Sequence, residues 1–346
     1  MKRLLICTLL AVCAACGGGG ASTPAANAPV ADPAASWQAA SFDALWKKFD
    51  EEYTYFDYKQ IDWNALRASY RPQALAAADT AAWLQTVGAM LGQLHDAHVR
   101  LTGPDGKSIA TYVSPRQPNW QAGVLAAYLE RWNVQRAGTS IAYARLTGGA
   151  YLAVSSWNEQ SVSVDQLDSA LDAVADAPTL ILDLRMNPGG NDQLAFALGA
   201  RFLTRTSVAH IVRTKTGPAH NALSAMTPIE VAPRRNTPYT RPVLLLVGAQ
   251  TASSSESLVS LLRGLPNVLV IGDTTAGASA RPQLYQAGNG ISFTVSTWQD
   301  YTAAGEPIED VGIAPAIRVD ATAAAFAAGR DPVLDAALAR LGVARP

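Results

Sequence analysis

The sequence predicts an α/β fold in which a mainly parallel sheet carries helices on both faces. Strand-like and helical segments alternate from about residue 141 onward, and two short runs are almost wholly apolar: "TLILDL" (179–184) and "PVLLLVG" (242–248). This alternation is typical of parallel strands joined by helical crossovers. With 346 residues, 49% of them hydrophobic, the chain can form one main domain and a smaller appendage.

The expected elements follow one another in strand–helix order. Strands are expected at 149–157, 179–184, 242–248 and 267–273, with another near 210–214, and helices at 164–177, 191–203 and 256–265. Sites in such sheets lie at the carboxyl ends of the strands. The loops "RMNPGGND" (185–192) and "AQTASSSES" (249–257) are therefore the candidate site.

The region before the sheet is predicted to be helical. Apolar residues recur at three- and four-residue spacing in "SFDALWKKFDEEYTYF" (41–56) and "DTAAWLQTVGAMLGQL" (79–94). Ser41 and Asp79 (or the residue after it) are the expected helix caps. We therefore expect an N-terminal helical domain of two or three helices at 37–101, followed by a connecting region at 102–140 with little periodicity.

The N-terminus has the features of a secretory signal. A basic start precedes a short apolar run, "LLICTLLAVCAAC" (4–16), that is too short for a permanent membrane span. "CAAC" followed by "GGGG" resembles the lipobox of bacterial lipoproteins, which implies cleavage of a signal peptide (1–15) and lipid attachment at Cys16. Residues 16–36 are then a flexible tether, and the bacterial cell envelope is the expected location. Secretion without a lipid is the alternative, because Cys13 stands where leucine is usual.

Composition limits the chemistry and the partners. All three cysteines lie in the leader, so the mature domain has no disulfide and no cysteine nucleophile. The net charge of −1 provides no basic surface for nucleic acid, which leaves a peptide, protein or small-molecule substrate. His95 and His98 could form a metal pair, but no third ligand has suitable spacing. No metal and no organic cofactor are expected.

Taken by themselves, the two loops leave their role open. Ser253 can be a helix cap or a nucleophile, because free backbone N–H groups at a helix start can bind an oxyanion. Gly189 and Gly190 can form a tight turn or bring backbone N–H groups close to an anion. A serine nucleophile needs a base, and His98 in "LHDAHVRL" (94–101) is a candidate among four histidines.

Several motifs in order resemble the C-terminal processing (tail-specific) serine peptidase family. They are "DLRMNPGG" (183–190), "TASSSE" (251–256) and "VIGDTTAG" (270–277). The segments 56–72 and 90–101 are similar to the branch related to the tricorn core and the interphotoreceptor retinoid-binding protein repeats. The resemblance implies a crotonase-like ββα layered core at 141–346 behind the small helical domain.

The resemblance also implies roles for individual residues. Ser253 stands at the nucleophile position and His98 at the position of the base, while Glu309 in "IEDVGIAPA" (308–316) corresponds to the glutamate that supports this base. The oxyanion would be held by the N–H groups of Gly190 (or Gly189) and Ser254. The implied protein is a secreted or lipid-anchored serine endopeptidase with a Ser-His-Glu arrangement.

Four features depart from the family pattern. Ala278 replaces the lysine base of the processing peptidases, Ala97 replaces a serine before the histidine, and Ala316 replaces an aspartate. No PDZ domain is evident between residues 101 and 141. A catalytically inactive ligand- or peptide-binding protein on the same scaffold is therefore the alternative, and a hydrolase of a non-peptide ester or amide is a third possibility.

Overall fold

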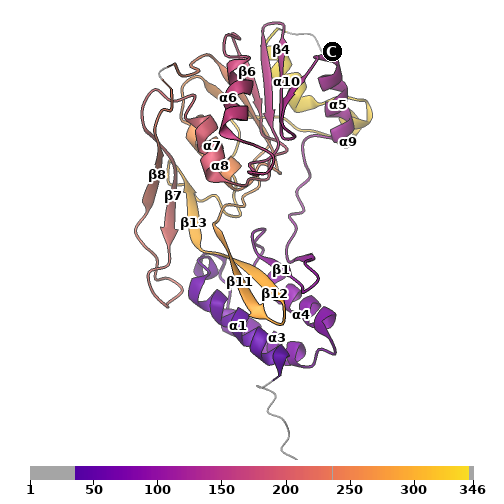
Figure 1. Ribbon diagram of the computed structural model, residues 1–346, viewed down its shortest axis with the longest axis vertical. Helices are drawn as coiled ribbons and strands as arrows, with labels where there is room; N and C mark the ends of the chain where they lie inside the picture. The colour runs from indigo at the N-terminus through magenta and orange to yellow at the C-terminus, as the bar shows by residue number, and fades with distance from the viewer. Residues whose placement is uncertain (1–35, 236, 343–346) are drawn as a thin grey trace, which may run out of the picture.

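The computed structural model describes residues 36–235 and 237–342. Two bodies are stacked along the long axis of the molecule, and a three-stranded sheet runs beside them (Figure 1). The larger body contains the seven-stranded sheet, and the smaller body contains the first helices and the four-stranded sheet. We call them the core body and the N-terminal body.

A seven-stranded sheet forms the centre of the core body, in the order β14-β10-β9-β6-β5-β4-β3. Its neighbouring pairs from β14 to β5 are parallel, while β4 and β3 are added antiparallel at one edge. The predicted α/β class with a mainly parallel sheet is confirmed, and the two antiparallel strands at the edge make the sheet mixed. The strands are β3 (Gln135–Ala137), β4 (Ile141–Leu146), β5 (Gly149–Val154), β6 (Leu180–Asp183), β9 (Val243–Val247), β10 (Val268–Gly272) and β14 (Ile317–Arg318).

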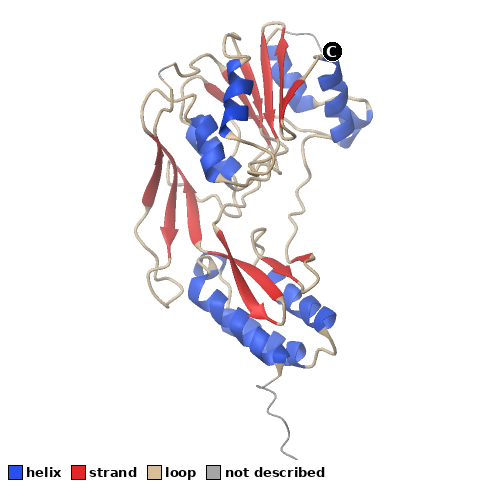
Figure 2. Cartoon of the chain, viewed as in Figure 1, coloured by secondary structure: helices blue, strands red, loops and turns tan. Residues whose placement is uncertain are grey.

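Helices cover both faces of this sheet (Figure 2). Alternate residues of one strand enter different clusters: Leu180 and Leu182 pack with α6, α7 and α8, whereas Ile181 packs with α5 and α10. Such alternation follows from the two-residue period of a strand. The helices are α5 (Ala122–Arg131), α6 (Val164–Asp172), α7 (Asp192–Gly199), α8 (Ser254–Arg263), α9 (Ala323–Ala327) and α10 (Pro332–Arg340).

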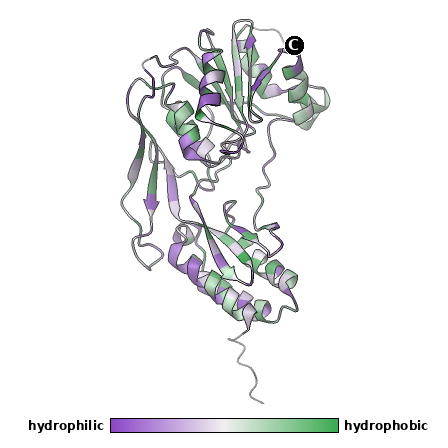
Figure 3. Cartoon of the chain, in the orientation of Figure 1, coloured by the Kyte–Doolittle hydropathy of each residue, from purple (hydrophilic) through white to green (hydrophobic). Residues whose placement is uncertain are grey.

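The N-terminal body begins with four helices, one or two more than expected. They are α1 (Trp37–Glu52), α2 (Phe56–Lys59), α3 (Trp63–Leu75) and α4 (Thr80–Gly92). Figure 3 shows hydrophilic and hydrophobic residues interspersed along these helices. Asp79 caps α4 as predicted, accepting a hydrogen bond from the Ala82 N–H at 2.8 Å. The cap predicted at Ser41 is wrong, because α1 starts at Trp37 with Ser36 as its cap, and Ser41 is buried within the helix.

A four-stranded antiparallel sheet completes the N-terminal body and extends beyond the predicted boundary at residue 101. Its order is β11-β12-β1-β2, from β1 (Arg100–Thr102), β2 (Ser108–Ala110), β11 (Pro282–Gly288) and β12 (Ile291–Ser296). Phe293 of β12 stacks on Phe49 of α1 with ring centroids 5.7 Å apart. The hairpin of β11 and β12, which the sequence assigned to the core, thus packs on the first helices.

The third sheet, in the order β13-β7-β8, joins the two bodies along one side (Figure 1). Its strands are β7 (Ser207–Thr214), β8 (Thr227–Val231) and β13 (Trp298–Thr302), all antiparallel. β13 follows β12 after a single residue, and β7 packs against α8. The N-terminal body is therefore held close to the end of the core sheet where α8 begins.

Candidate active site

The serine turn connects β9 to α8, and Ser253 is the last residue before the helix. Its backbone angles are φ 56° and ψ −129°, which a residue other than glycine rarely adopts. Such a conformation costs about 1–3 kcal/mol and persists only where the surroundings enforce it. Residues in this state cluster at functional sites, so the strain singles out Ser253 from its two serine neighbours.

Glu256 is the group that holds this turn in place. Its fully buried carboxylate accepts hydrogen bonds from the Ser253 N–H (3.2 Å) and from the N–H groups of Gly277 (2.8 Å) and Ala278 (3.0 Å). The Thr275 hydroxyl donates a fourth, at 2.6 Å. Burial raises the pKa of Glu256 to about 7, and the four donors oppose that rise.

The glycine loop lies directly against the serine turn. The Thr251 hydroxyl donates to the Leu184 carbonyl at 2.9 Å, and the Ala252 N–H donates to the Asn187 carbonyl at 3.2 Å. A Cβ atom at Gly189 would lie 2.6 Å from Ser253 Cβ, and Gly189 has φ 103°. Both the close approach and the backbone angle require glycine at this position.

A buried ion cluster anchors the start of the glycine loop. The Arg185 guanidinium binds Asp183 at 2.8 Å and Asp331 at 2.7 Å, and all three side chains are fully buried. The loop therefore leaves the end of β6 from a fixed position.

Two backbone N–H groups beside Ser253 are open to a ligand. Within the described residues, neither the Gly190 N–H nor the Ser254 N–H has an acceptor. The Gly189 N–H is already engaged, because it donates to Asn187 Oδ1 at 3.0 Å. Of the two glycines considered from sequence, only Gly190 therefore offers a free donor. The Ser254 hydroxyl donates to the Gly190 carbonyl at 3.0 Å, and this hydrogen bond links the two residues that carry the free N–H groups.

The third serine of the turn has a different environment. Ser255 is fully buried, and its hydroxyl oxygen accepts a hydrogen bond from Trp157 Nε1 at 2.9 Å. The backbone of Trp157 in turn pairs with the glycine loop, donating to the Gly189 carbonyl at 3.1 Å and accepting from the Asn191 N–H at 2.9 Å. Ser255 therefore supports the packing of the loop and does not face the cavity.

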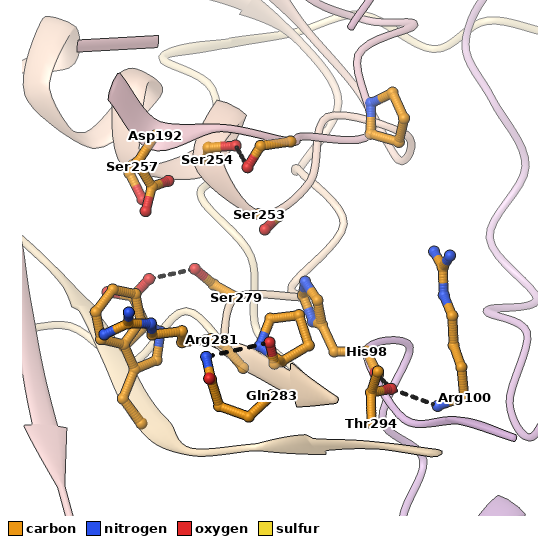
Figure 4. Close-up of a pocket in the computed structure, with 16 residues that line it drawn as sticks. His98, Arg100, Asp192, Ser253, Ser254, Ser257, Ser279, Arg281, Gln283 and Thr294 are labelled. Carbon is orange, nitrogen blue, oxygen red and sulfur yellow. Dashed lines mark hydrogen bonds between the residues drawn. The ribbon is translucent and has the colours of Figure 1, made fainter. Parts of the chain in front are cut away.

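His98 comes to this site from the N-terminal body. It lies just before β1 and lines a cavity of about 440 Å³ together with Gly190, Ser253 and Ser254. Figure 4 shows the Ser253 hydroxyl pointing into the cavity and the His98 ring on the facing wall. Burial lowers the pKa of His98, so the ring is neutral at pH 7 and can accept a proton.

The carboxylate beside His98 is that of Asp96. Asp96 Oδ1 lies 3.9 Å from His98 Nδ1 and accepts the His98 backbone N–H at 2.8 Å, while Oδ2 accepts from the Ser296 hydroxyl at 2.7 Å. Asp96 is fully buried, and its charge opposes the lowering of the His98 pKa. Sequence reasoning missed Asp96, although its place two residues before His98 was the available signal.

Glu309 lies near this cluster but is not hydrogen-bonded to His98. Its Oε1 binds the Lys59 ammonium at 2.7 Å, and its Oε2 accepts the Ser279 N–H at 3.2 Å. Burial, followed by the charge of Asp96, raises the pKa of Glu309 well above its ordinary value, and Lys59 opposes this rise. The resemblance allows Glu309 to support His98 either directly or through a water, and among the described residues the direct hydrogen bond is not formed. Lys59, on α2, had no sequence signal.

Ala278, where the resemblance places a lysine, contributes its backbone to the turn. Its carbonyl accepts the Ser253 N–H at 2.8 Å, which adds to the restraint from Glu256. Among the residues that the structure describes, no three histidine, cysteine or acidic side chains are grouped as metal ligands would be. The possible metal partner His95 instead stacks on Tyr112 with centroids 5.2 Å apart.

A strained serine at a helix start, two open N–H groups and a neutral histidine define a serine-hydrolase type of site on an α/β scaffold. Residues 148–319 match the family described as peptidase family S41, and residues 33–92 match the tricorn protease C1 domain. The chain belongs to peptidase family S41, whose members are serine-type hydrolases.

Curated relatives carry consistent names. The chain is 30% identical over 159 residues to the carboxy-terminal processing protease CtpA of Bacillus subtilis (strain 168). This aligned segment covers 45% of this chain and 32% of that protein. It is 25% identical over 180 residues to the carboxyl-terminal-processing protease of Synechocystis sp., covering 52% of this chain and 38% of the relative. The match thus spans only about a third of the length of these relatives.

Solved structures share the fold over most of the chain. A structure from Parabacteroides merdae, of a protein assigned as a peptidase, is 26% identical with a TM-score of 0.79, covering 88% of this chain and 97% of that one. Mature CPAF (14% identical, TM-score 0.66) covers 88% of this chain and 98% of its own. The tricorn protease (10% identical, TM-score 0.57) covers 88% and 36%. The last two show the fold alone.

Glu256→Gln should change both stability and its pH dependence. Glu256 keeps its proton to about pH 7 in the folded state, whereas its ordinary pKa is 4.5. The unfolded chain therefore loses the proton first, and the contribution of Glu256 to the free energy of unfolding falls as pH rises between these values. Glu256→Gln removes this slope. The new amide N–H₂ group would also face backbone N–H groups that need an acceptor, which lowers the free energy of unfolding by about 1–3 kcal/mol.

Urea unfolding at pH 5 to 8 measures both effects. Glu306→Gln is the matched control, because its side chain is 61% exposed and pairs with Arg263 on the surface. An equal pH slope in the wild type and Glu256→Gln would contradict the assigned role of Glu256.

Proposed function

We propose that this protein is a serine endopeptidase in which Ser253 is the nucleophile and His98 its general base. The observation that supports this most strongly is the strained conformation of Ser253 beside the open Gly190 and Ser254 N–H groups, in a cavity that also contains His98. The substrate is a peptide or protein, as the names of the curated relatives suggest. No cofactor is invoked in the proposed reaction.

In the first step, Ser253 Oγ attacks a peptide carbonyl carbon and His98 accepts the hydroxyl proton. The carbonyl oxygen becomes negatively charged and is bound by the N–H groups of Gly190 and Ser254. Each such donor contributes about 10²–10³ in rate, because it is already oriented toward the developing charge. The start of α8 adds its partial positive charge at the same point.

In the second step, His98 returns the proton to the leaving amine as the peptide bond breaks, and an acyl-enzyme remains on Ser253. Water then attacks the ester, with His98 again accepting the proton, and the acid product leaves. The low pKa of His98 suits both steps, because the ring is a neutral base before each attack.

Asp96 is the positioning residue for His98 in this proposal. Its carboxylate is the group next to Nδ1, and a small rotation of the ring would close the present 3.9 Å to a hydrogen bond. Glu309 does not contact His98 in this proposal, because it binds the Lys59 ammonium and the Ser279 N–H. This division differs from the Ser-His-Glu arrangement that the resemblance implied.

The alternative of an inactive binding protein rested on Ala97, Ala278 and Ala316. The first two do not remove any group that the proposed reaction uses, because Asp96 stands beside His98 and the base is not a lysine. A binding scaffold would also need no strained serine. These observations favour the peptidase.

We also propose that the protein is anchored in the bacterial cell envelope through a lipid on Cys16. The signal peptide, Cys16 and nearly all of the tether lie outside the described residues, so the support is the sequence motif. Within residues 36–235 and 237–342, no helix has the length and hydrophobicity to cross a bilayer. Metabolic labelling with a palmitate analogue should mark the wild type and not Cys16→Ser, and equal labelling of both would contradict the anchor.

Alanine substitutions of the three serines in the turn should have different effects on activity and stability. Ser253→Ala should lose both labelling by a fluorophosphonate and hydrolysis of an unstructured peptide, because its neighbours cannot replace the nucleophile. Ser254→Ala should keep most activity, since its backbone N–H remains. Ser255→Ala should lower the melting temperature, because Trp157 Nε1 loses its acceptor. Labelling that persists in Ser253→Ala would refute the nucleophile.

Substitutions of Asp96 and Glu309 should affect the pH profile of kcat/KM differently. Asp96→Asn removes the charge that raises the His98 pKa, so the acidic limb should move to lower pH while kcat falls about 10²–10⁴-fold. Glu309→Gln should leave the limb in place, and His98→Gln should abolish activity. A shift of the limb in Glu309→Gln but not in Asp96→Asn would restore Glu309 as the group that supports His98.

A further inference from the structure

A buried lysine lies between the two bodies, close to the site. Lys59 ends the short helix α2 of the N-terminal body, and its side chain is only 4% exposed. The ammonium binds Glu309 Oε1 at 2.7 Å and Asp310 Oδ1 at 2.8 Å, and it donates to the His95 carbonyl at 3.3 Å. Burial lowers the pKa of this group, but the charges of Glu309, Asp310 and Asp96 raise it above its ordinary value, so the ammonium stays charged.

The acceptors of the Lys59 ammonium belong to two segments that support the site. His95 lies in the turn that leads to His98, and it has an uncommon φ of 48°. Glu309 and Asp310 belong to the loop between β13 and β14, which is part of the core body. The ammonium therefore connects the turn of the proposed base with a loop of the other body.

The loop that contains Glu309 and Asp310 contacts the backbone that restrains the nucleophile. Glu309 Oε2 accepts the Ser279 N–H at 3.2 Å, and the Asp310 N–H donates to the Gly277 carbonyl at 2.8 Å. The residue between these two provides the carbonyl that accepts the Ser253 N–H at 2.8 Å. Hydrogen bonds thus connect the lysine with the support of the nucleophile as well as with the turn of the base.

Uncharged side chains attach α2 to the core body independently of the ammonium. The Tyr55 hydroxyl donates to the Ser279 carbonyl at 2.8 Å, and the Tyr58 hydroxyl donates to the Glu309 carbonyl at 2.9 Å. The Tyr55 ring also lies 5.7 Å from the Lys59 ammonium. Removing the ammonium therefore leaves α2 in contact with the core body. Tyr58 offers a matched control, since its hydroxyl binds the same loop without a charge.

The charge of Lys59 also acts on the proposed base. Burial is the main reason that the pKa of His98 is lowered. The charges of Asp96 and Asp300 oppose this change, whereas those of Arg100 and Lys59 lower the pKa further. Without the ammonium the pKa of His98 should therefore rise, which is the opposite of the change expected when Asp96 loses its charge.

We propose that Lys59 is a positioning residue of the active site, whose ammonium keeps the turn of His98 in place against the loop that supports Ser253. Lys59 is not among the residues that line the cavity of Ser253 and His98, so it acts through the segments that support them and through its charge. The proposal rests on the peptidase function for its kinetic readout, but the pKa of His98 can be measured without catalysis.

The first arm of the experiment measures kcat and KM across pH. Lys59→Met should lower kcat by about 10²-fold with KM nearly unchanged, because a base displaced by about 1 Å has this effect. The acidic limb of kcat/KM should move to higher pH. Lys59→Arg keeps the charge and should restore the limb. Tyr58→Phe should leave both kcat and the limb as in the wild type.

A double variant separates positioning from charge compensation. Lys59→Met leaves Glu309 buried without its partner, which destabilises the fold, whereas Lys59→Met combined with Glu309→Gln leaves no unpaired charge there. The double variant should therefore fold and still have the low kcat, because the His95 carbonyl and the loop remain unconnected. A wild-type kcat in either variant would mean that the ammonium does not position the base, and would overturn the proposal.

The second arm measures the pKa of His98 by NMR titration of protein labelled in its histidines, with His98→Gln to assign the signal. The pKa should be higher in Lys59→Met and in the double variant than in the wild type, and unchanged in Tyr58→Phe. The same result in a protein that cleaves no peptide would leave Lys59 in its role, and the peptidase function alone would fail. An unchanged His98 pKa in both variants without the ammonium, or an equal loss of kcat in Tyr58→Phe, overturns the proposal.

Discussion

The restraint on the backbone of Ser253 is the interaction on which the rest of the site depends. The Ser253 N–H lies between the Ala278 carbonyl and the Glu256 carboxylate, and Glu256 also binds the loop of residues 275–278. These bonds offset the strain of a positive φ and orient both the hydroxyl and the following N–H. The same turn makes Gly189 obligatory, because no Cβ fits beside Ser253.

The second requirement is that the N-terminal body packs against the core body so that His98 faces Ser253. Ser253 and Gly190 belong to the core body, whereas His98 and Asp96 belong to the N-terminal body and are tied to β12 through Ser296. Strand pairing between β1 and β12 joins residues nearly 200 positions apart. The distance between Ser253 and His98 is therefore set by long-range packing, and in the proposed mechanism changes far from the cavity can alter activity without touching a reacting group.

The sequence predicted what local patterns determine. Apolar runs such as "PVLLLVG" predicted the strands, and the predicted site residues Ser253, His98 and Gly190 line one cavity in the structure. It did not predict that β11 and β12 leave the core for α1, because strand partners distant in sequence carry no local signal. For the same reason the pairing of Glu309 with Lys59 was missed, and Asp96 was overlooked beside His98. Side-chain partners of buried charges emerge only from the tertiary structure.

A crystal structure of the protein after reaction with a small fluorophosphonate tests the central claim most directly. We predict phosphorus bonded to Ser253 Oγ, with φ of Ser253 still positive. A phosphonyl oxygen should lie within about 3 Å of the N–H groups of Gly190 and Ser254, and the His98 ring should contact the adduct. An adduct on another residue, or one whose oxygen is bound by neither N–H group, would contradict the account.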